Sequence, residues 1–184
     1  MSATPIFPDA NVRSQTYYVA RTSVRCPHCG LSTRLLALAM SPDHETLHDG
    51  THADSGADSD VDDVDDEQCD ESVQDDWQRA NANALLFYVE GLPGAVQRRL
   101  QQLSRFFHLA YDPGAMNSYW ANHCEHCGTL LGDHELHCEP EGAFMPCSEA
   151  AAKDIQLLQF QEPFAAAAVG YACEPEFFTC MRRR

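Results

Sequence analysis

The sequence predicts an α+β fold in which antiparallel β-strands surround a metal-binding pair of cysteine turns. Three observations support this class: the pattern C-x-H-C-G occurs twice, one segment has helical periodicity, and one long stretch is rich in aspartate. A chain of 184 residues with 44% hydrophobic residues is long enough to bury one core. We therefore expect a single domain over residues 1–184.

The two cysteine turns are Cys-Pro-His-Cys-Gly at residues 26–30 and Cys-Glu-His-Cys-Gly at residues 124–128. In such a turn the two thiolates converge on one metal ion, and the glycine relieves the tight backbone that follows. Two turns supply four sulfurs, a complete tetrahedral set that leaves no open position for a substrate. We therefore predict a structural Zn²⁺ site whose ligands are Cys26, Cys29, Cys124 and Cys127.

Other interpretations of these turns stay open at the level of sequence. Each pair is also compatible with a redox-active C-x-x-C, although no thioredoxin-like βαβ pattern follows. Two separate zinc sites, each completed by nearby histidines, are a second alternative. The histidines close to the turns are His28, His123, His126, His134 and His137. For any one of them, an exposed or hydrogen-bonded imidazole is the simpler expectation.

Strand-forming residues flank both turns. Aromatic and β-branched residues from Tyr17 to Val24 lead into the first turn, and residues 35–40 lead out of it. The second turn follows an aromatic segment in the same way. We call a cysteine turn with its two flanking strands a zinc-knuckle hairpin. The expected segments are the first zinc-knuckle hairpin (15–40), an acidic disordered loop (41–76), a helical insertion (77–114), the second zinc-knuckle hairpin (115–147) and a C-terminal core segment (148–184).

The helical insertion depends mainly on residues 93–107. Pro93 suits the first turn of a helix, and Val96, Leu100 and Leu103 recur at helical spacing. Residues 77–90 fit either a helix or a strand. In the C-terminal segment we expect one strand near residues 155–160 and a short helix.

The negative charge of the chain is concentrated in one segment. The formal net charge is −16, and 15 of the 28 acidic residues lie between Asp43 and Asp76. The other 13 nearly balance the 12 lysine and arginine residues. Residues 41–76 hold almost no large apolar side chains, so burial cannot offset the entropy lost on ordering. This composition predicts the disordered acidic loop.

A possible catalytic motif lies at the start of this acidic loop. Residues 44–48 read HETLH and match H-E-x-x-H, in which a helix places two zinc-binding imidazoles one turn apart. Only Leu47 is apolar nearby, so the segment has no face with which a helix could pack. A chance match in a loop is the preferred interpretation. A zinc-dependent hydrolase using His44, Glu45 and His48 stays an alternative.

One longer block resembles a known family. Residues 119–144 read YWANHCEHCGTLLGDHELHCEPEGAF. Together with the first cysteine pair and Leu92-Pro93, this block is similar to an uncharacterised family of bacterial cytoplasmic proteins. A strand–turn–strand unit used twice around one metal also resembles a zinc ribbon, here split by ~95 residues where a minimal ribbon has ~15–20. The resemblance implies a zinc-ribbon-like fold and no known activity.

The last part of that block, residues 132–144, has two interpretations. It is either a surface for a partner or a loop in which aspartate and histidine hydrogen bonds stabilise the second zinc-knuckle hairpin. Local bonding of side chains to backbone is common, so the second interpretation is preferred.

These features predict a non-enzymatic, zinc-stabilised protein-binding module. The acidic loop would attract a basic partner, as an acidic inhibitor or immunity-type protein attracts a basic toxin or nuclease. A nucleic-acid-binding zinc ribbon is the alternative from another class, with Tyr17, Tyr18, Tyr119 and Trp120 as stacking faces. Because the acidic charge repels phosphates, nucleic acid is the less favoured partner.

The sequence also bears on location. No apolar run approaches the ~18 residues needed to cross a bilayer, and the first residues lack the pattern of a secretory signal. We therefore expect a cytoplasmic protein with no membrane contact, whose nine cysteines are thiols or metal ligands. The oligomeric state and the identity of the partner are left open.

Overall fold

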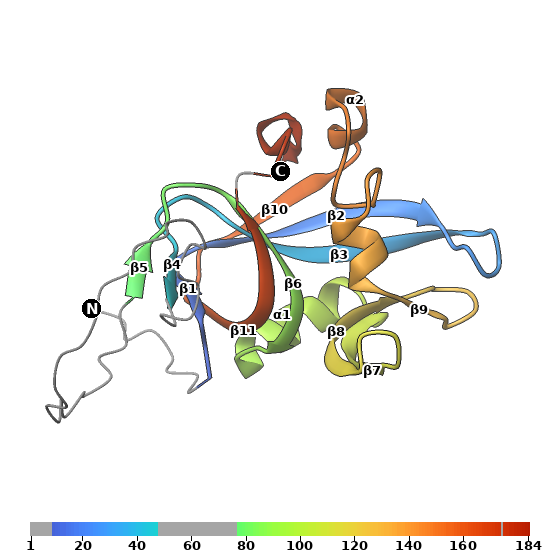
Figure 1. Cartoon of the computed structure of the whole chain (residues 1–184), viewed down its shortest axis with the longest axis horizontal. Coiled ribbons are helices and arrows are strands. Elements are labelled where there is room, and N and C mark those ends of the chain that lie inside the picture. Colours follow the sequence, from blue (N-terminus) through green and yellow to red (C-terminus); the bar gives the residue numbers. More distant parts are fainter. Residues whose placement is uncertain (1–8, 48–76, 174) are drawn as a thin grey trace, which may run out of the picture.

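The computed structural model describes residues 9–47, 77–173 and 175–184. Most of the regular structure consists of two β-sheets, and the helices are few and short (Figure 1). The fold is therefore mostly β and agrees broadly with the predicted α+β class. Among the described residues, no helix is long and apolar enough to cross a membrane.

Nine strands form the larger sheet. They are β1 (Val12–Ser14), β2 (Tyr17–Arg25), β3 (Ser32–Met40), β4 (Glu45–Leu47), β5 (Trp77–Arg79), β6 (Ala84–Gly91), β10 (Gln156–Phe160), β11 (Phe164–Cys173) and β12 (Arg182–Arg183). Their order across the sheet is β12-β10-β2-β3-β6-β11-β1-β4-β5. Neighbours are antiparallel apart from the parallel pair β10 and β12.

The smaller sheet has the order β7-β8-β9. Its strands are β7 (Phe107–Asp112), β8 (Asn117–His123) and β9 (Leu130–Leu131). The helical elements are α1 (Gly94–Leu103), a π-helical turn η1 (His134–Cys138), α2 (Glu149–Ala152) and a 3₁₀ turn η2 (Phe178–Cys180).

The strands predicted around the first cysteine turn are confirmed as a long hairpin. β2 and β3 pair over their whole lengths, from Tyr17 opposite Met40 to Arg25 opposite Ser32. Successive residues of β2 point to opposite faces of the sheet, and both faces are covered. Tyr17 therefore packs in one hydrophobic core and Tyr18 in the other.

The two cores lie on opposite faces of the larger sheet. One contains α1 residues together with Phe107 and Trp120 of the smaller sheet. The other contains Leu136 of η1 and Phe178 of η2. Each face of the central strands is thus shielded from water, which explains why these strands read as nearly continuous apolar runs.

The predicted helix is confirmed in position and corrected in length. α1 begins after Pro93, and the side chains of Val96 and Leu100 are fully buried. The helix ends at Leu103, because Ser104 is already extended and Phe107 starts β7. Phe106 and Phe107, the last two residues of the predicted helical segment, belong to the loop and to β7.

The helical insertion expected over residues 77–114 is corrected in content: α1 is its only helix, and strands β5, β6 and β7 lie in the same range. β6 lies within this range and pairs with β3 on one side and β11 on the other. It is therefore a central strand of the larger sheet. Its short apolar run fits both types of element, and pairing with distant strands decided the outcome.

The acidic segment assigned to residues 41–76 also needs correction at its start. Residues 45–47 form β4, which pairs with β1 and with β5. The ordered sheet therefore extends to Leu47. The rest of the predicted loop, residues 48–76, lies outside the described residues.

In the C-terminal segment, the strand near residues 155–160 is confirmed as β10 and the short helix as η2. A second strand, β11, was missed. Its run of four alanines has low β propensity, but Ala165, Ala166 and Ala168 are buried between neighbouring strands. Sheet packing has overridden local preference here.

A buried amide joins the smaller sheet to the larger one. The side chain of Asn122 in β8 donates to the carbonyl of Leu36 and accepts from the amide of Leu36, each at 2.9 Å. Asn122 is only 2% exposed. β6 pairs with β3 only at residues 38–40, so Leu36 has no strand partner on that side. The Asn122 side chain provides the missing hydrogen bonds.

We expect Asn122→Ala to lower the free energy of unfolding by about 2–4 kcal/mol, because it leaves two buried backbone groups without partners. Urea denaturation of wild type and variant measures this. Ser118→Ala, on an exposed residue of the same strand, is the control and should change stability by less than about 0.5 kcal/mol. An equally small effect of Asn122→Ala would contradict the linking role.

Candidate metal centre

The two cysteine turns have the same backbone geometry and lie at the same end of the molecule, at the tips of the β2–β3 and β8–β9 hairpins (Figure 1). In each turn the first cysteine amide donates to the carbonyl of the residue after the glycine. The glycine amide donates back to the carbonyl of that cysteine. Gly30 and Gly128 have φ angles of 74° and 73°, a left-handed conformation that favours glycine.

The four predicted ligands come together. The Sγ atoms of Cys26 and Cys127 are 3.7 Å apart, and those of Cys29 and Cys124 are 3.6 Å apart. All four sulfurs lie within 4.8 Å of one another. A tetrahedron with metal–sulfur bonds of ~2.3 Å has edges of ~3.8 Å, so the spacing fits one ion at the centre. These four cysteines form a group that could hold a metal ion.

Hydrogen-bond donors favour the thiolate form at two of the sulfurs. The amides of Cys127 and His126 lower the pKa of the Cys124 thiol to about 6. The hydroxyl and amide of Thr129 lower the pKa of Cys127, whose Sγ lies 3.3 Å from Thr129 Oγ1. The thiolate is the form that binds metals, so the second turn is prepared for a cation.

The pKa of the Cys29 thiol shows the effect of placing four sulfurs close together. The amide of Leu31 lowers the pKa of this thiol, but burial and hydrogen bonds involving the three neighbouring sulfurs outweigh this and raise that pKa to about 12. Four adjacent negative charges are unfavourable without a cation. Binding of a metal ion would therefore release protons from this group.

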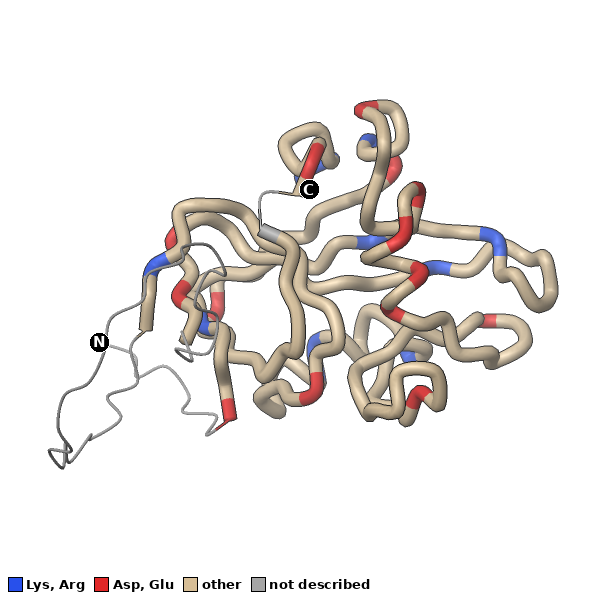
Figure 2. The backbone as a smooth tube through the Cα atoms, viewed as in Figure 1, with Lys and Arg blue, Asp and Glu red and all other residues tan. Residues whose placement is uncertain are grey.

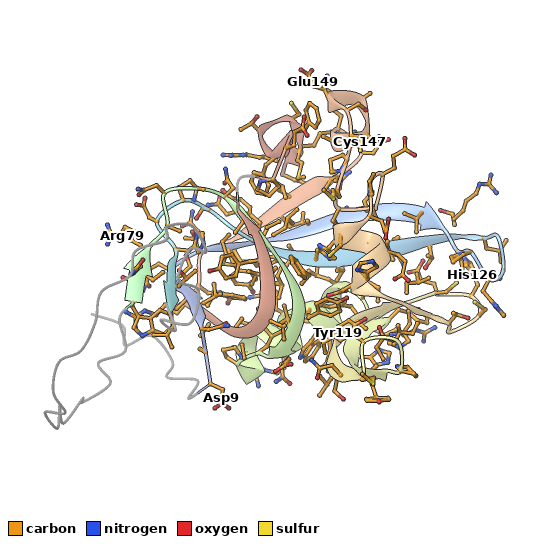
Figure 3. All side chains as sticks on the ribbon, in the orientation of Figure 1. Asp9, Arg79, Tyr119, His126, Cys147 and Glu149 are labelled. Atoms are coloured by element: carbon orange, nitrogen blue, oxygen red, sulfur yellow. The ribbon has the colours of Figure 1, made fainter. Side chains whose placement is uncertain are left out.

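The second turn is also fixed to strand β3 by polar contacts. The amide of Glu125 donates to Thr33 Oγ1 at 3.0 Å, and its carboxylate pairs with Arg34 at 2.7 Å. A ring nitrogen of His126 lies 2.9 Å from the Ser32 carbonyl oxygen, at the far end of the hairpins (Figure 3). These contacts hold both turns in register.

The histidines near the turns have other surroundings. His123 stacks on His108 with ring centroids 4.1 Å apart, and burial together with that neighbour lowers its pKa. His134 lies 3.1 Å from a carboxylate oxygen of Glu139. His137 is buried against Phe144, and burial lowers its pKa to about 3. In the described part of the chain, the four cysteines are the only group of three or more such side chains close enough to hold a metal.

The HETLH motif does not form a helix in the described residues. His44 is fully buried and its Nδ1 lies 2.9 Å from the Ser41 carbonyl oxygen. Glu45 lies in strand β4 and pairs with Arg13 at 2.6 Å. His48 lies outside the described residues. The helical spacing on which the hydrolase alternative depends is therefore absent at residues 45–47.

The aromatic residues considered for stacking on nucleic acid are buried. Tyr17 and Tyr119 are 0% exposed, and Tyr18 and Trp120 are 5% exposed. They serve as core residues, as their place in strands flanking the cysteine turns would suggest. None presents a free ring face for a base.

Residues 132–144 contain a buried carboxylate whose partner the sequence pattern does not indicate. Asp133 is only 4% exposed, and one of its oxygens accepts a 2.7 Å hydrogen bond from the amide of Tyr88 in β6. Tyr88 has a φ of 50°, close to a register shift between β6 and β11. The expected local bonding of Asp133 is thus corrected in part: its backbone amide donates to the Tyr119 hydroxyl, but its carboxylate supports an irregular position within the distant strand β6.

Comparison with known proteins adds no relative to this description. No family model matches the chain, and no curated protein or solved structure matches it. The four-cysteine group in a mostly β fold is therefore the feature on which a function must be argued.

The environment of Asp133 predicts a pH dependence of stability. Burial raises its pKa from 3.8 to about 7, despite the opposing effect of the Tyr88 amide. Between these pH values the folded state holds a proton that the unfolded state has lost. Stability from this group therefore falls as the pH rises through that window, by up to about 4 kcal/mol in total.

Asp133→Asn keeps an acceptor for Tyr88 and removes the charge. We expect wild type and variant to have similar stability at pH 5, and wild type to be the less stable by about 1–3 kcal/mol at pH 8. Urea denaturation at matched metal content measures this difference. Both proteins contain His137 and the same cysteines, so the effects of these groups on stability cancel in the comparison. A difference that does not change with pH would contradict the assignment.

Proposed function

We propose that this protein is a non-enzymatic, zinc-stabilised protein-binding module with a basic protein partner. The observation that supports it is the convergence of four cysteine sulfurs at the tips of two hairpins. Thiolates are soft ligands, and a tetrahedral set of four is typical of Zn²⁺. Cys26, Cys29, Cys124 and Cys127 would complete its coordination, so the ion would have a structural role.

The zinc ion would act as a crosslink between distant parts of the chain. The paired sulfurs come from residues 95 and 101 positions apart in the sequence. Each turn alone contributes two ligands, and neither hairpin can complete the site without the other. The ion would thus stabilise the relative placement of the two sheets, in the manner of a split zinc ribbon.

The partner is inferred from charge. The chain carries a formal net charge of −16, and its carboxylates are concentrated in one segment. Such a distribution accelerates encounter with a basic protein and repels nucleic acid. An acidic inhibitor or immunity-type protein fits this charge distribution, and the family resemblance supports only a location in the bacterial cytoplasm.

Native mass spectrometry tests the metal assignment. We expect one zinc ion per chain in wild type, and none in Cys124→Ser because three remaining sulfurs hold zinc much less tightly. Cys147→Ser is the control, since Cys147 is an exposed thiol outside the group, and it should keep the ion. A His48→Ala variant should also keep it. Loss of zinc only in the histidine variant would overturn the four-cysteine site.

The role of the acidic segment is tested by a replacement that the sheet permits. Leu47 and Trp77 face each other in the β4–β5 pair, so residues 48–76 can be replaced by Asn-Gly as a two-residue turn. This removes 13 carboxylates and changes the formal net charge from −16 to −3.

We expect immobilised wild-type protein to retain basic proteins at low salt and to release them as salt is raised. The Asn-Gly variant should lose most of this retention. A variant that keeps the segment but carries Asn and Gln in place of its acids is the matched control and should behave like the Asn-Gly variant. Identification of the retained proteins by mass spectrometry is the readout, and unchanged recovery in both variants would contradict the proposal.

A further inference from the structure

A groove of about 860 Å³ lies beside the metal centre, between the two zinc-knuckle hairpins and η1. The β2 end and the first cysteine turn form one side, and β9 with η1 forms the other. The end of β7 contributes Asp112. The groove is thus bordered by elements that the four cysteines hold together.

Two carboxylates converge in this groove above a glycine. A methyl group built on Gly132 would lie 2.7 Å from Glu135 Oε2 and 3.4 Å from Asp112 Oδ2. The two oxygens therefore face the same space, which the absence of a side chain at Gly132 leaves open. Asp112 is held in place because Oδ2 accepts the Tyr119 hydroxyl and Oδ1 accepts the Gly114 amide.

The acidic groups of the groove have no cationic partner. None of the ion pairs formed among the described residues includes Asp112, Glu135 or Glu141. Arg25 lies on the opposite side, where its guanidinium is 3.4 Å from the Gly30 carbonyl oxygen. Figure 2 shows acidic residues gathered along η1 and the segment after it.

The electrostatic environment of Tyr88 agrees with this charge distribution. Burial raises the pKa of its phenol, and the charges of Cys138, Asp133, Asp112 and Glu135 raise it further. Tyr88 itself lines the groove. The space between the hairpins is therefore at a negative potential that a positive group would relieve.

Apolar side chains complete the groove. Val24 comes from β2, Leu130 and Leu131 from β9, and Leu136 from η1. β9 is an edge strand of the smaller sheet, paired only with β8 among the described residues. A ligand that fits this surface carries positive charge next to apolar groups. A phosphate backbone has the wrong sign of charge.

We propose that this groove binds an extended basic segment of the partner protein, with an arginine or lysine seated between Asp112 and Glu135 above Gly132. Neighbouring apolar side chains of that segment pack on Val24 and Leu130, which line the groove and are partly exposed. The inference rests on the proposed function in that it assumes a basic protein partner. It adds the surface that recognises the partner and the residues that select it.

NMR titration of the zinc-loaded full chain tests the proposal. The probe is the peptide Ac-Leu-Arg-Leu-Arg-Leu-NH2, and its control is the same peptide with citrulline in place of arginine, which keeps the shape and removes the charge. We expect the arginine peptide to shift amide signals of β9, η1 and the β7–β8 turn. The citrulline peptide should shift them weakly or not at all.

Substitutions locate the binding site. Glu135→Gln removes one groove charge from a side chain that makes no hydrogen bond to the described residues, and should weaken binding about 5-fold. Asp112→Asn/Glu135→Gln should weaken it further. Glu149→Gln removes the same charge from an exposed position in α2, away from Tyr119 (Figure 3), and should leave the affinity unchanged.

Two outcomes would overturn the groove and leave the proposed function standing. One is that the arginine peptide shifts no groove amides at millimolar concentration. The other is that its binding persists in the double variant and disappears in the Asn-Gly variant, which would place binding on the acidic segment. Failure of the proposed function is seen in other experiments: native mass spectrometry would find no zinc, or the immobilised protein would retain no basic proteins. Neither result depends on the peptide titration.

Discussion

The structure depends on the contact between the two cysteine turns. In this contact Cys29 meets Cys124, 95 positions further along the chain, and Cys26 meets Cys127, 101 positions further along. The outer half of the β2–β3 hairpin needs this contact. β10 pairs with β2 only over residues 17–21, and β6 pairs with β3 only over residues 38–40. Beyond these limits the hairpin is a two-stranded ribbon, which is marginally stable by itself in water. The second hairpin and the sulfur cluster supply the missing support.

Polar contacts make this support specific. Asn122 satisfies both backbone groups of Leu36, and the second cysteine turn bonds to Thr33 and Arg34 of β3. Hydrophobic packing alone would tolerate small shifts between the sheets. Buried hydrogen bonds do not, because a shift leaves polar groups unpaired. The four sulfurs can thus be brought to the spacing that a tetrahedral ion requires.

The same arrangement creates the features that bear on function. Fixing the two hairpin tips leaves a groove between them, bordered by the end of β2, by β9 and by η1. The Asp133 carboxylate stabilises the irregular part of β6 by accepting a hydrogen bond from the Tyr88 amide. Asp112 and Glu135 face the space above Gly132 in the groove. A structural metal and a recognition surface would then depend on one another, since loss of the ion would release both sides of the groove.

The sequence by itself determined the features that short-range chemistry specifies. The spacing of Cys26, Cys29, Cys124 and Cys127 is local within each turn, and the start of α1 follows from Pro93 and its apolar periodicity. Only the tertiary structure decided the rest. β6 and the alanine-rich β11 are ambiguous locally and become strands because distant partners pair with them. The bond from Asp133 to Tyr88 and the convergence of Asp112 with Glu135 link residues that share no sequence pattern, so only the folded backbone brings them together.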